Sequence, residues 1–321
     1  MKAAVLTGAG VEICDVSRPT PKPAEVLVRT RACGLNRADL TMVAGHRHGS
    51  HGGAGAVAGM EFAGEVVDVG AEVADFKPGD RVMGAGQGAF AEFAVTDYGR
   101  TNRLPDGMSF ETAACLPVGL NTMHDAIATN GRLRPGEAVL IQGASTGVGI
   151  LGLQIAKMKG ARLVIGTSTR DDKRRRLKEF GADLVLDSRD PSWADQVVAA
   201  TGGGVELIVD MLSGFVANQN LHAARVLGRI INIGRLGGMT NEFDFDTHSR
   251  KRIHYIGASF RTRSIEEIRE IGRLMRADLW DAVLAGKLRI PIDRTFPLAA
   301  ITDAVAHARS NEHFGKIVLT V

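Results

Sequence analysis

The sequence has few residues of the kinds that build disulfide frameworks, zinc knuckles or base-stacking surfaces. Its three cysteines, Cys14, Cys33 and Cys115, share no Cys-x-x-Cys spacing and are odd in number, which argues against a disulfide framework and a structural zinc knuckle. Because disulfides are rare in reducing compartments, this pattern favours a cytoplasmic location. Aromatic residues make up only 5% of the chain, too few to suggest a platform for nucleic-acid bases.

Strong charge and long apolar runs are also missing. Lysine and arginine number 39 against 36 aspartates and glutamates, so the net charge of +3 does not point to a nucleic-acid partner. No segment approaches the roughly 18 apolar residues that a membrane helix needs. The first six residues carry one charge and a short apolar run, unlike a signal peptide. We therefore expect neither a nucleic-acid partner nor a membrane partner.

Glycine is abundant, at 39 of 321 residues, and the chain is long enough for about two domains. Up to about residue 104, short alternating apolar runs separated by turn residues predict a small β-barrel or sandwich. The predicted strands are Ala3–Thr7, Val11–Val16, Val26–Arg31, Glu61–Val69, Arg81–Met83, Phe90–Val95 and Arg103–Leu104.

The pattern changes near residue 119, where strands begin to alternate with helices. Alternation of this kind predicts βαβ units around a parallel sheet, so the fold class is α/β. The strands expected here are Val139–Gln142, Leu163–Gly166, Leu184–Leu186, Leu207–Asp210, Arg229–Ile233 and Ile253–Ala258. Four helices are expected between them: the first carries the apolar pattern Ile150, Leu153, Ile155 and Ala156, and the others are Asp172–Phe180, Ala194–Ala200 and Ala217–Val226. Three further helices, Ile265–Leu274, Trp280–Ala285 and Ile301–Ala308, precede a last strand at Ile317–Val321, and these pieces are expected to pack on the first domain.

The segment after the strand Val139–Gln142 carries the clearest chemical signal. Small residues there allow the backbone to approach a pyrophosphate, and the following helix N-terminus offers N–H groups and partial positive charge. A glycine-rich turn alone is weak evidence, but its place in the first βα unit is the context that supports dinucleotide binding. The residues expected to bind the cofactor in this turn are Gly143, Ala144, Ser145, Gly147, Val148 and Gly149.

The end of the second strand of this region bears on which dinucleotide binds. NAD-binding folds usually place an acid there against the ribose 2′-hydroxyl. Here Ser168, Thr169 and Arg170 follow the strand, and Lys173 lies one turn later. Hydroxyls and cations fit a 2′-phosphate, so we predict NADPH. Arg175 and Arg176 are interpreted as a solvated helix face.

Three motifs follow one another along the chain, Gly34–Asp39, Gly59–Val66 and Pro78–Val82. In this order they resemble the medium-chain dehydrogenase/reductase superfamily, and the resemblance covers essentially the whole chain. With the glycine-rich turn and the ending Gly315–Leu319, the sequence is similar to the zinc-free quinone oxidoreductase branch, which includes zeta-crystallin-like proteins. Within that branch, Asn36–Leu40 and Gly257–Arg263 resemble the subgroup of the tumour-suppressor-inducible quinone reductase.

The resemblance implies a GroES-like barrel domain, residues 1–118 and 258–321, and a Rossmann domain, residues 119–257, with the cofactor in the cleft between them. It also implies a homodimer joined through the Rossmann domain. The family has a tyrosine near the 2′-phosphate where this sequence has Ser188. The other residues that the resemblance places at the cofactor are Ile233, Phe260, Arg261, Phe314 and Lys316.

The resemblance also directs attention to a metal site. Zinc alcohol dehydrogenases of the superfamily use a cysteine, a histidine and a cysteine, and the matching positions hold Asn36, Met60 and Val118. None of these is a usual zinc ligand. The four-cysteine structural lobe is absent as well, because Gly84–Phe90 is a short connection. No metal is expected.

A glycine-rich loop, Gly45–Gly59, interrupts the β pattern and contains His46, His48 and His51. Three histidines could coordinate a metal, but a glycine-flanked loop without a nearby acid or cysteine is more typical of a polar surface. With Arg47, the segment is a candidate substrate lid, and the alternative is a surface loop without a role. We expect His46, Arg47 and His48 to contact substrate.

Two residues are catalytic candidates through the resemblance. Asn36 matches the family's asparagine beside the nicotinamide, and Thr122 matches its threonine there. Taken alone, Asn36 would be a turn cap and Thr122 a residue near a helix start. Cys33 and Cys115 lie in apolar sequence and are predicted to be packing thiols rather than nucleophiles.

The sequence therefore predicts an NADPH-dependent reductase that transfers hydride to a quinone or an α,β-unsaturated carbonyl. Two alternatives remain open: a reductase of enoyl thioesters, and a low-turnover NADPH-binding sensor or nucleic-acid-binding protein.

Overall fold

The computed structural model describes residues 1–8 and 10–321. The chain forms two compact units, one made of Met1–Val118 and Phe260–Val321, the other of Gly119–Ser259. The second unit thus ends two residues beyond the limit expected at residue 257. The predicted α/β class, with a mostly antiparallel β unit and a parallel-sheet unit, is confirmed. Among the described residues, no helix is both long and apolar enough to cross a bilayer.

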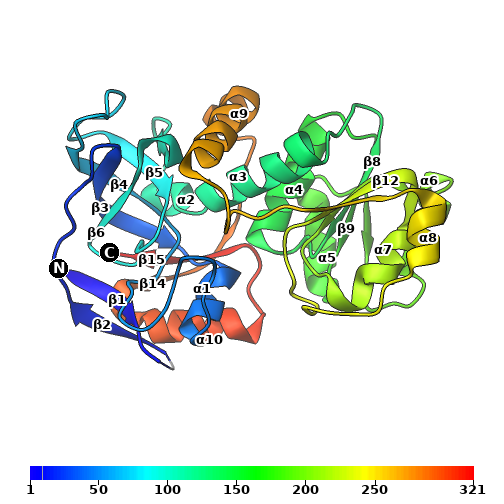
Figure 1. The fold of residues 1–321 in the computed structure, drawn as a ribbon, viewed down its shortest axis with the longest axis horizontal. Coiled ribbons are helices and arrows are strands. Elements are labelled where there is room, and N and C mark those ends of the chain that lie inside the picture. Colours follow the sequence, from blue (N-terminus) through cyan, green and yellow to red (C-terminus); the bar gives the residue numbers. More distant parts are fainter. Residues whose placement is uncertain (9) are drawn as a thin grey trace. The chain divides into compact units, whose positions relative to one another are not determined.

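The first unit is built on a seven-stranded sheet in the order β14-β15-β3-β4-β5-β7, with β6 paired to β3, beside a separate β1–β2 hairpin (Figure 1). Side chains of β3 alternate between buried and exposed over part of its length, as expected for a sheet with one covered face. The strands are β1 Lys2–Leu6, β2 Val11–Asp15, β3 Glu25–Gly34, β4 Glu61–Val69, β5 Arg81–Ala85, β6 Phe93–Asp97, β7 Thr101–Arg103, β14 Ile292–Pro297 and β15 Lys316–Thr320.

The most distant pairing in the sequence joins β15 to β3, where Val318 lies opposite Gly34 in antiparallel register. At Gly64, a Cβ atom would stand 2.0 Å from the Arg29 carbonyl oxygen, so the close approach of β4 to β3 requires glycine. The strand predicted at Phe90–Val95 instead begins at Phe93. Phe90 is used differently, because its backbone pairs with Ala4 and Ala58.

The helices of the first unit include two that the sequence did not predict, Arg37–Val43 and Phe110–Ala113, and one that was predicted as two. A helix begins after Asn36 because Asn36 and Asp39 form a capping box. The helices predicted at Ile265–Leu274 and Trp280–Ala285 are a single helix, since Met275 and Leu279 continue its buried stripe across the supposed gap. The helices are α1 Arg37–Val43, α2 Phe110–Ala113, α9 Ile265–Leu284 and α10 Ile301–Ser310, with 3₁₀ turns η1 Tyr98–Arg100 and η5 Leu298–Ala300.

The second unit is a six-stranded sheet in the order β10-β9-β8-β11-β12-β13, and all of its pairs are parallel. All five residues of β8 are buried, as expected for a central parallel strand. The strands are β8 Ala138–Gln142, β9 Leu163–Thr167, β10 Leu184–Leu186, β11 Val205–Asp210, β12 Ala224–Asn232 and β13 His254–Gly257.

Helices cover this sheet: α4 packs on β8 and β9, α5 on β9 and β10, and both α7 and α8 on β12. The helix predicted at Ala217–Val226 ends at Ala223, because Ala224 already pairs with Val205 as the start of β12. The helices are α3 Pro117–His124, η2 Asp125–Asn130 (a π-helix), α4 Gly147–Met158, α5 Asp171–Leu177, η3 Lys178–Phe180, α6 Trp193–Thr201, η4 Gly214–Val216, α7 Ala217–Ala223 and α8 Phe245–Lys251; α3 spans the boundary between the units.

The strand order fixes where this sheet can bind a ligand. From β8 the chain moves outward through β9 to β10 and then returns to the other side of β8 with β11. Open α/β sheets bind ligands beyond the carboxyl ends of the strands at such a reversal. Gln142, at the end of β8, and Asp210, at the end of β11, mark this place.

Candidate functional site

The glycine-rich turn of the second unit has the geometry that its sequence predicts. Gly143 adopts φ +70°, a left-handed conformation that favours glycine, directly after β8. Thr146 is the N-cap of α4, and its hydroxyl accepts a hydrogen bond from the Gly149 amide at 3.0 Å. A Cβ atom at Gly149 would stand 2.7 Å from the Ala144 Cα atom, so the helix packs closely on the turn.

Two serines join this turn to the end of β9, because the hydroxyls of Ser145 and Ser168 lie 3.0 Å apart. The predicted cofactor-binding residues Gly143, Ala144, Ser145, Gly147, Val148, Gly149 and Ser168 are therefore brought together in one turn and the strand end beside it. The helix that follows is 12 residues long, enough to present partial positive charge at its first turn.

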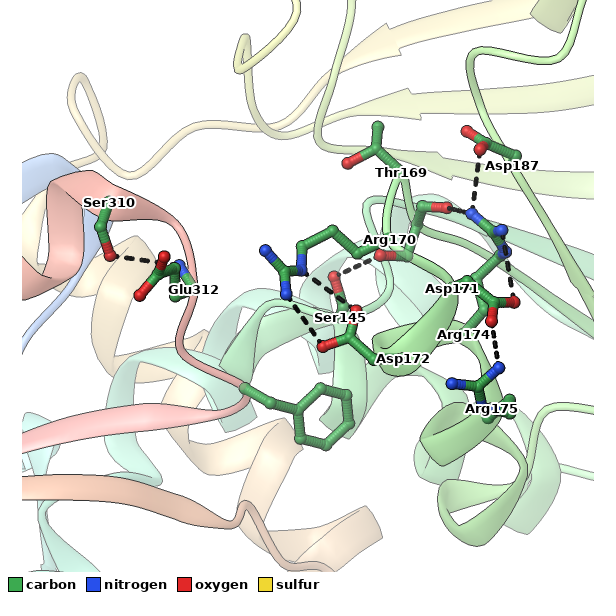
Figure 2. Close-up of polar contacts among 12 residues, drawn as sticks. Ser145, Thr169, Arg170, Asp171, Asp172, Arg174, Arg175, Asp187, Ser310 and Glu312 are labelled. Atoms are coloured by element: carbon green, nitrogen blue, oxygen red, sulfur yellow. Dashed lines mark hydrogen bonds and ion pairs between the residues drawn. The ribbon is translucent and has the colours of Figure 1, made fainter.

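Beyond β9, arginine side chains pair with aspartate side chains. Figure 2 shows Arg170 forming two contacts with Asp172, at 3.1 and 3.2 Å, and Arg174 reaching Asp187 at 3.0 Å. Arg175 pairs with Asp171, in keeping with its interpretation as part of a solvated helix face. The region beyond β9 thus holds an exposed guanidinium at Arg170 whose carboxylate partner is itself more than half exposed.

Three other residues near this strand end are placed differently from what a simple phosphate site would suggest. Lys173 and Ser188 are buried, with 4% and 2% of their surface exposed. Arg189, which the sequence analysis did not select, donates to the Thr169 carbonyl oxygen at 2.6 Å and keeps a 66% exposed side chain. Since β9 and β10 are parallel neighbours, the residues that follow the two strands lie close together. This pairing is the feature that identifies Arg189 as a candidate phosphate ligand.

In the first unit, Asn36 lies in a buried charged cluster with Glu61 and Lys316. The Asn36 side-chain amide donates to Glu61 at 2.9 Å and to the Gly34 carbonyl oxygen at 3.3 Å. Lys316 donates to the Asn36 side-chain oxygen at 2.7 Å and forms a close ion pair with Glu61. Both amide hydrogens of Asn36 therefore have acceptors within the protein.

Lys316, which is predicted to contact the cofactor, has 3% of its surface exposed and is paired with Asn36 and Glu61. Glu61 is completely buried, and its second oxygen accepts from the Val118 amide at 2.8 Å. Charges without solvent need partners of this kind. These three residues, Asn36, Glu61 and Lys316, form the Asn36 cluster, and their contacts hold the Asn36 side chain in one orientation.

A second carboxyl lies beside this cluster. Asp39 accepts from the Asn36 backbone amide at 2.7 Å, but its other oxygen is buried and has no hydrogen-bond partner among the described residues. Burial raises the pKa of the Asp39 carboxyl from 3.8 to about 7. Burial likewise raises the pKa of Cys115 to about 12 and that of Cys33 well above its usual value. The prediction that both thiols are buried is confirmed.

The histidine loop is anchored over its second half and turns back on itself in its first half. Ala56 and Ala58 exchange backbone hydrogen bonds with β1, and His48 pairs with His51 through backbone groups. Burial, then Arg100 and His48, lower the pKa of His51 to about 4, so its ring is neutral at pH 7. In residues 1–8 and 10–321, no group of three or more histidine, cysteine, aspartate or glutamate side chains could hold a metal ion.

The remaining predicted residues are distributed over both units. Thr122 is half-buried on α3, and Ile233 follows β12 and donates to the Asp210 carbonyl oxygen at 2.9 Å. Arg261 lies against the histidine loop, where a Cβ at Gly49 would be 3.0 Å from its side chain. Phe314 is 3% exposed. Phe260 lies near the Arg263 guanidinium, 5.8 Å from its ring centre.

Known proteins resemble this chain over its whole length. Two family models match it, an alcohol dehydrogenase GroES-like domain over residues 22–106 and a zinc-binding dehydrogenase over residues 147–277. The chain is 30% identical to the synaptic vesicle membrane protein VAT-1 homolog of Danio rerio, over 99% of this chain and 70% of that protein. It is 29% identical to the quinone oxidoreductase of Rattus norvegicus, over 95% of this chain and 92% of that protein.

A third relative is much longer. The chain is 32% identical to the erythronolide synthase EryA2 of Saccharopolyspora erythraea over 95% of its own length, but spans only 8% of that synthase. Among solved structures, a mycobacterial protein complexed with NADPH superposes with a TM-score of 0.89 at 26% identity, covering 100% of both chains. The CurK enoyl reductase superposes with a TM-score of 0.88 at 26% identity, covering 99% of this chain and 98% of that one.

Proposed function

Because the chain belongs to the medium-chain dehydrogenase/reductase superfamily, we propose that it is an NADPH-dependent reductase of quinones or α,β-unsaturated carbonyls that works without zinc. The observation that carries the proposal is the glycine-rich turn at the reversal of a parallel sheet, followed by a strand end with hydroxyls and arginines instead of an acid. A cytoplasmic location, favoured by the cysteine pattern, is part of the same proposal.

The residues of the second unit fit a dinucleotide with a 2′-phosphate. The turn Gly143–Gly149 and the start of α4 would hold the pyrophosphate, and Ser168, Thr169, Arg170 and Arg189 would hold the 2′-phosphate. When bound, the nicotinamide supplies a hydride. Asp172 is already paired with Arg170, so a phosphate would replace a carboxylate of the same sign. Lys173 and Ser188 are buried, so we assign them a supporting role near the phosphate rather than contact with its solvent-exposed oxygens.

The buried group of Asn36, Glu61 and Lys316 supports a reaction without zinc. By the family resemblance, Asn36, Met60 and Val118 match the zinc-ligand positions, and the Lys316 ammonium lies 2.7 Å from the Asn36 side-chain oxygen. A divalent cation there would face a buried positive charge. Dialysis against a chelator is therefore expected to leave turnover unchanged, and elemental analysis to find no stoichiometric zinc. Turnover that disappears on dialysis and returns with zinc would contradict this.

Reduction of a quinone or enone places negative charge on an oxygen, which needs a hydrogen-bond donor. Both side-chain amide hydrogens of Asn36 are already donated to protein acceptors. We therefore propose that Asn36 positions neighbouring groups by accepting hydrogen bonds on its side-chain oxygen. The Thr122 hydroxyl is then the favoured donor. His46, Arg47 and His48 are proposed to contact the substrate from the loop, and water to deliver the proton.

The test is a panel of quinones, simple enones and enoyl thioesters, each measured with NADPH and with NADH. We expect turnover of quinones or enones with NADPH, and at least about tenfold weaker use of NADH. No turnover of any substrate, despite tight NADPH binding, would favour a sensor over an enzyme. Equal use of both cofactors would contradict the assignment of NADPH.

A reductase of enoyl thioesters is the second candidate. The similarity to part of a polyketide-type synthase and to the CurK enoyl reductase favours it. In the first unit, the Arg261 Cβ atom lies against Gly49, in the loop that carries Arg47 and His48, and an anionic carrier would be proposed to dock on these residues. A kcat/KM for an enoyl thioester at least about a hundredfold above that for quinones would select this candidate.

A further inference from the structure

Four buried polar side chains of the second unit are joined in a row across the carboxyl ends of its central strands. They are Thr167 at the end of β9, Gln142 at the end of β8, Asn220 on α7 and Asp210 at the end of β11, and each has 0% of its surface exposed. Polar groups hidden from water need hydrogen-bond partners, and a row of them is stable only when every member is satisfied. Each of these side chains has a partner in the row.

The hydrogen bonds all run in one direction. The Gly143 amide donates to the Thr167 hydroxyl at 3.0 Å, and this hydroxyl donates to the Gln142 side-chain oxygen at 2.7 Å. The Gln142 amide donates to the Asn220 side-chain oxygen at 2.8 Å, and the Asn220 amide donates to Asp210 at 3.0 Å. The row therefore begins on the glycine-rich turn and ends on a carboxylate, which can only accept when ionised.

The other oxygen of Asp210 holds a second turn. It accepts from the amides of Leu212 and Ser213 at 2.8 and 2.9 Å. Ser213 has φ +55°, a conformation that non-glycine residues rarely adopt, and its hydroxyl donates to the Gly234 carbonyl oxygen at 2.7 Å. One carboxylate thus fixes the turn after β11 directly and the turn after β8 through three side chains.

We propose that Asp210 and Asn220 are positioning residues, and that the ionised carboxylate sets the direction of the row and so holds Gly143 in its binding shape before a cofactor arrives. The part of this inference that concerns the cofactor rests on the proposed function. The row itself does not, because it is complete within the protein. Nothing in it requires Asp210 or Asn220 to touch the cofactor or the substrate.

The direction of the row explains why a carboxylate is needed. An amide at position 210 that kept its oxygen toward Leu212 and Ser213 would turn its NH₂ group toward the NH₂ group of Asn220, donor against donor. The conflict is relieved only if Asn220 and Gln142 both rotate, which reverses the row. Thr167 would then accept twice and lose its acceptor in Gln142.

The experiment compares Asp210→Asn, Asn220→Asp and the double variant, with Asn218→Asp as the matched control on the same helix. Asn218 is exposed and outside the row, where its side-chain oxygen accepts from the Asp244 amide. The primary measurement is hydrogen exchange at the Gly143 amide in cofactor-free protein. The second is NADPH affinity, and the third is kcat at saturating NADPH.

We expect Asp210→Asn to speed exchange at Gly143 and to weaken NADPH binding by about tenfold each, with kcat within about twofold of wild type. Asn220→Asp alone should do the same, because it places two carboxylates side by side. The double variant exchanges the two groups and restores every donor–acceptor pair, so it should return both quantities to within about twofold of wild type. The control should resemble wild type.

A folded Asp210→Asn variant with wild-type exchange at Gly143 would overturn the proposal, as would a double variant no better than the two single ones. If Asp210→Asn does not fold, Thr167→Val tests the opposite end of the row, and unchanged exchange at Gly143 there would be equally decisive. Failure of the wild type to bind NADPH would refute the proposed function only, since exchange in cofactor-free protein measures the row independently.

Discussion

At the scale of single residues, Asp39 meets two opposing demands. Its carboxylate caps α1 by accepting from the Asn36 backbone amide, yet it is fully buried, and within the described part of the chain one oxygen has no hydrogen-bond partner. The Lys316 ammonium nearby lowers the pKa and the Glu61 carboxylate raises it, but burial outweighs both. Capping of α1 requires an oxygen acceptor at position 39, whereas burial favours an uncharged side chain there.

This conflict predicts a pH-dependent stability. Because the folded pKa of Asp39 is about 7 and its ordinary value is 3.8, the folded state binds the proton more tightly. The associated destabilisation is absent below about pH 4, grows as the pH rises, and is complete above about pH 7, where it amounts to roughly 4 kcal/mol.

Asp39→Asn keeps an oxygen that can cap the helix and removes the titration. Relative to wild type, the variant should therefore gain a few kcal/mol in free energy of unfolding between pH 5 and pH 8, measured by urea unfolding at both pH values. Asp39→Ala, which loses the cap as well, serves as the control and should be weakened at pH 5 also. A wild type and an Asp39→Asn variant with parallel pH profiles would rule this account out.

At the scale of elements, the ends of β9 and β10 determine the cofactor preference that we propose. Arg170→Ala together with Arg189→Ala removes two exposed guanidiniums from these ends. A hydrogen bond to a charged group contributes about 1.5–3 kcal/mol, so NADPH affinity should fall about tenfold or more while NADH affinity changes little.

Isothermal titration with each cofactor measures this, and Arg175→Ala is the matched control because Arg175 is 72% exposed and pairs with Asp171. A control variant that loses as much NADPH affinity as the double variant would show that only net charge matters. Lys173 is not part of the test, since the buried lysine would alter packing as well as charge.

The histidine loop is the second element with a predicted behaviour. Residues 55–58 are tied to β1, so opening should be confined to residues 45–53. Replacing His46, Arg47 and His48 with alanine should change KM or substrate preference by several-fold and leave NADPH affinity near normal. Hydrogen exchange in 45–53 should also slow when NADPH and a quinone are both present. A triple variant with wild-type kinetics and unchanged exchange would assign the loop no role.

Some elements and site residues could be predicted from the sequence, and others could not. The turn Gly143–Gly149 was predictable because its cause is local: glycine after a strand and a threonine cap before a helix. The prediction of two helices in place of α9 was wrong, because Met275 and Leu279 continue one buried stripe across the helix. The Asn36 cluster was not predictable, since Glu61 and Lys316 come together only when β4 and β15 flank β3. Arg189 required the pairing of β9 with β10 to be known.

At the scale of the whole molecule, the second unit has a free sheet edge. In the part of the chain that the structure describes, strand β13 pairs only with β12, and the exposed apolar side chains of this unit include Met239 at 77% and Phe245 at 75% exposure. Open edges and large exposed apolar groups favour association. We predict that the chain forms the homodimer that the family resemblance implies, through this unit.

Met239→Asp with Phe245→Asp should convert the dimer to a monomer at micromolar concentration, measured by sedimentation velocity. The thermal unfolding of the monomer should stay cooperative, because both side chains are exposed in the single chain. Exposed Leu284→Asp, on α9 of the other unit, is the control and should remain dimeric. A monomeric wild type would refute the prediction.

The place of β15 has a consequence for synthesis on the ribosome. The second unit is one continuous stretch, Gly119–Ser259, and all of its strands are available once that stretch has emerged. The first unit begins earlier but waits for residues 316–320, which fill the position between β14 and β3 and bring Lys316 to Glu61. Until then Glu61 has no ammonium beside it and one edge of β3 is open. The part of the protein that is translated first is therefore completed last, and it is the nascent N-terminal segment that most needs protection from aggregation.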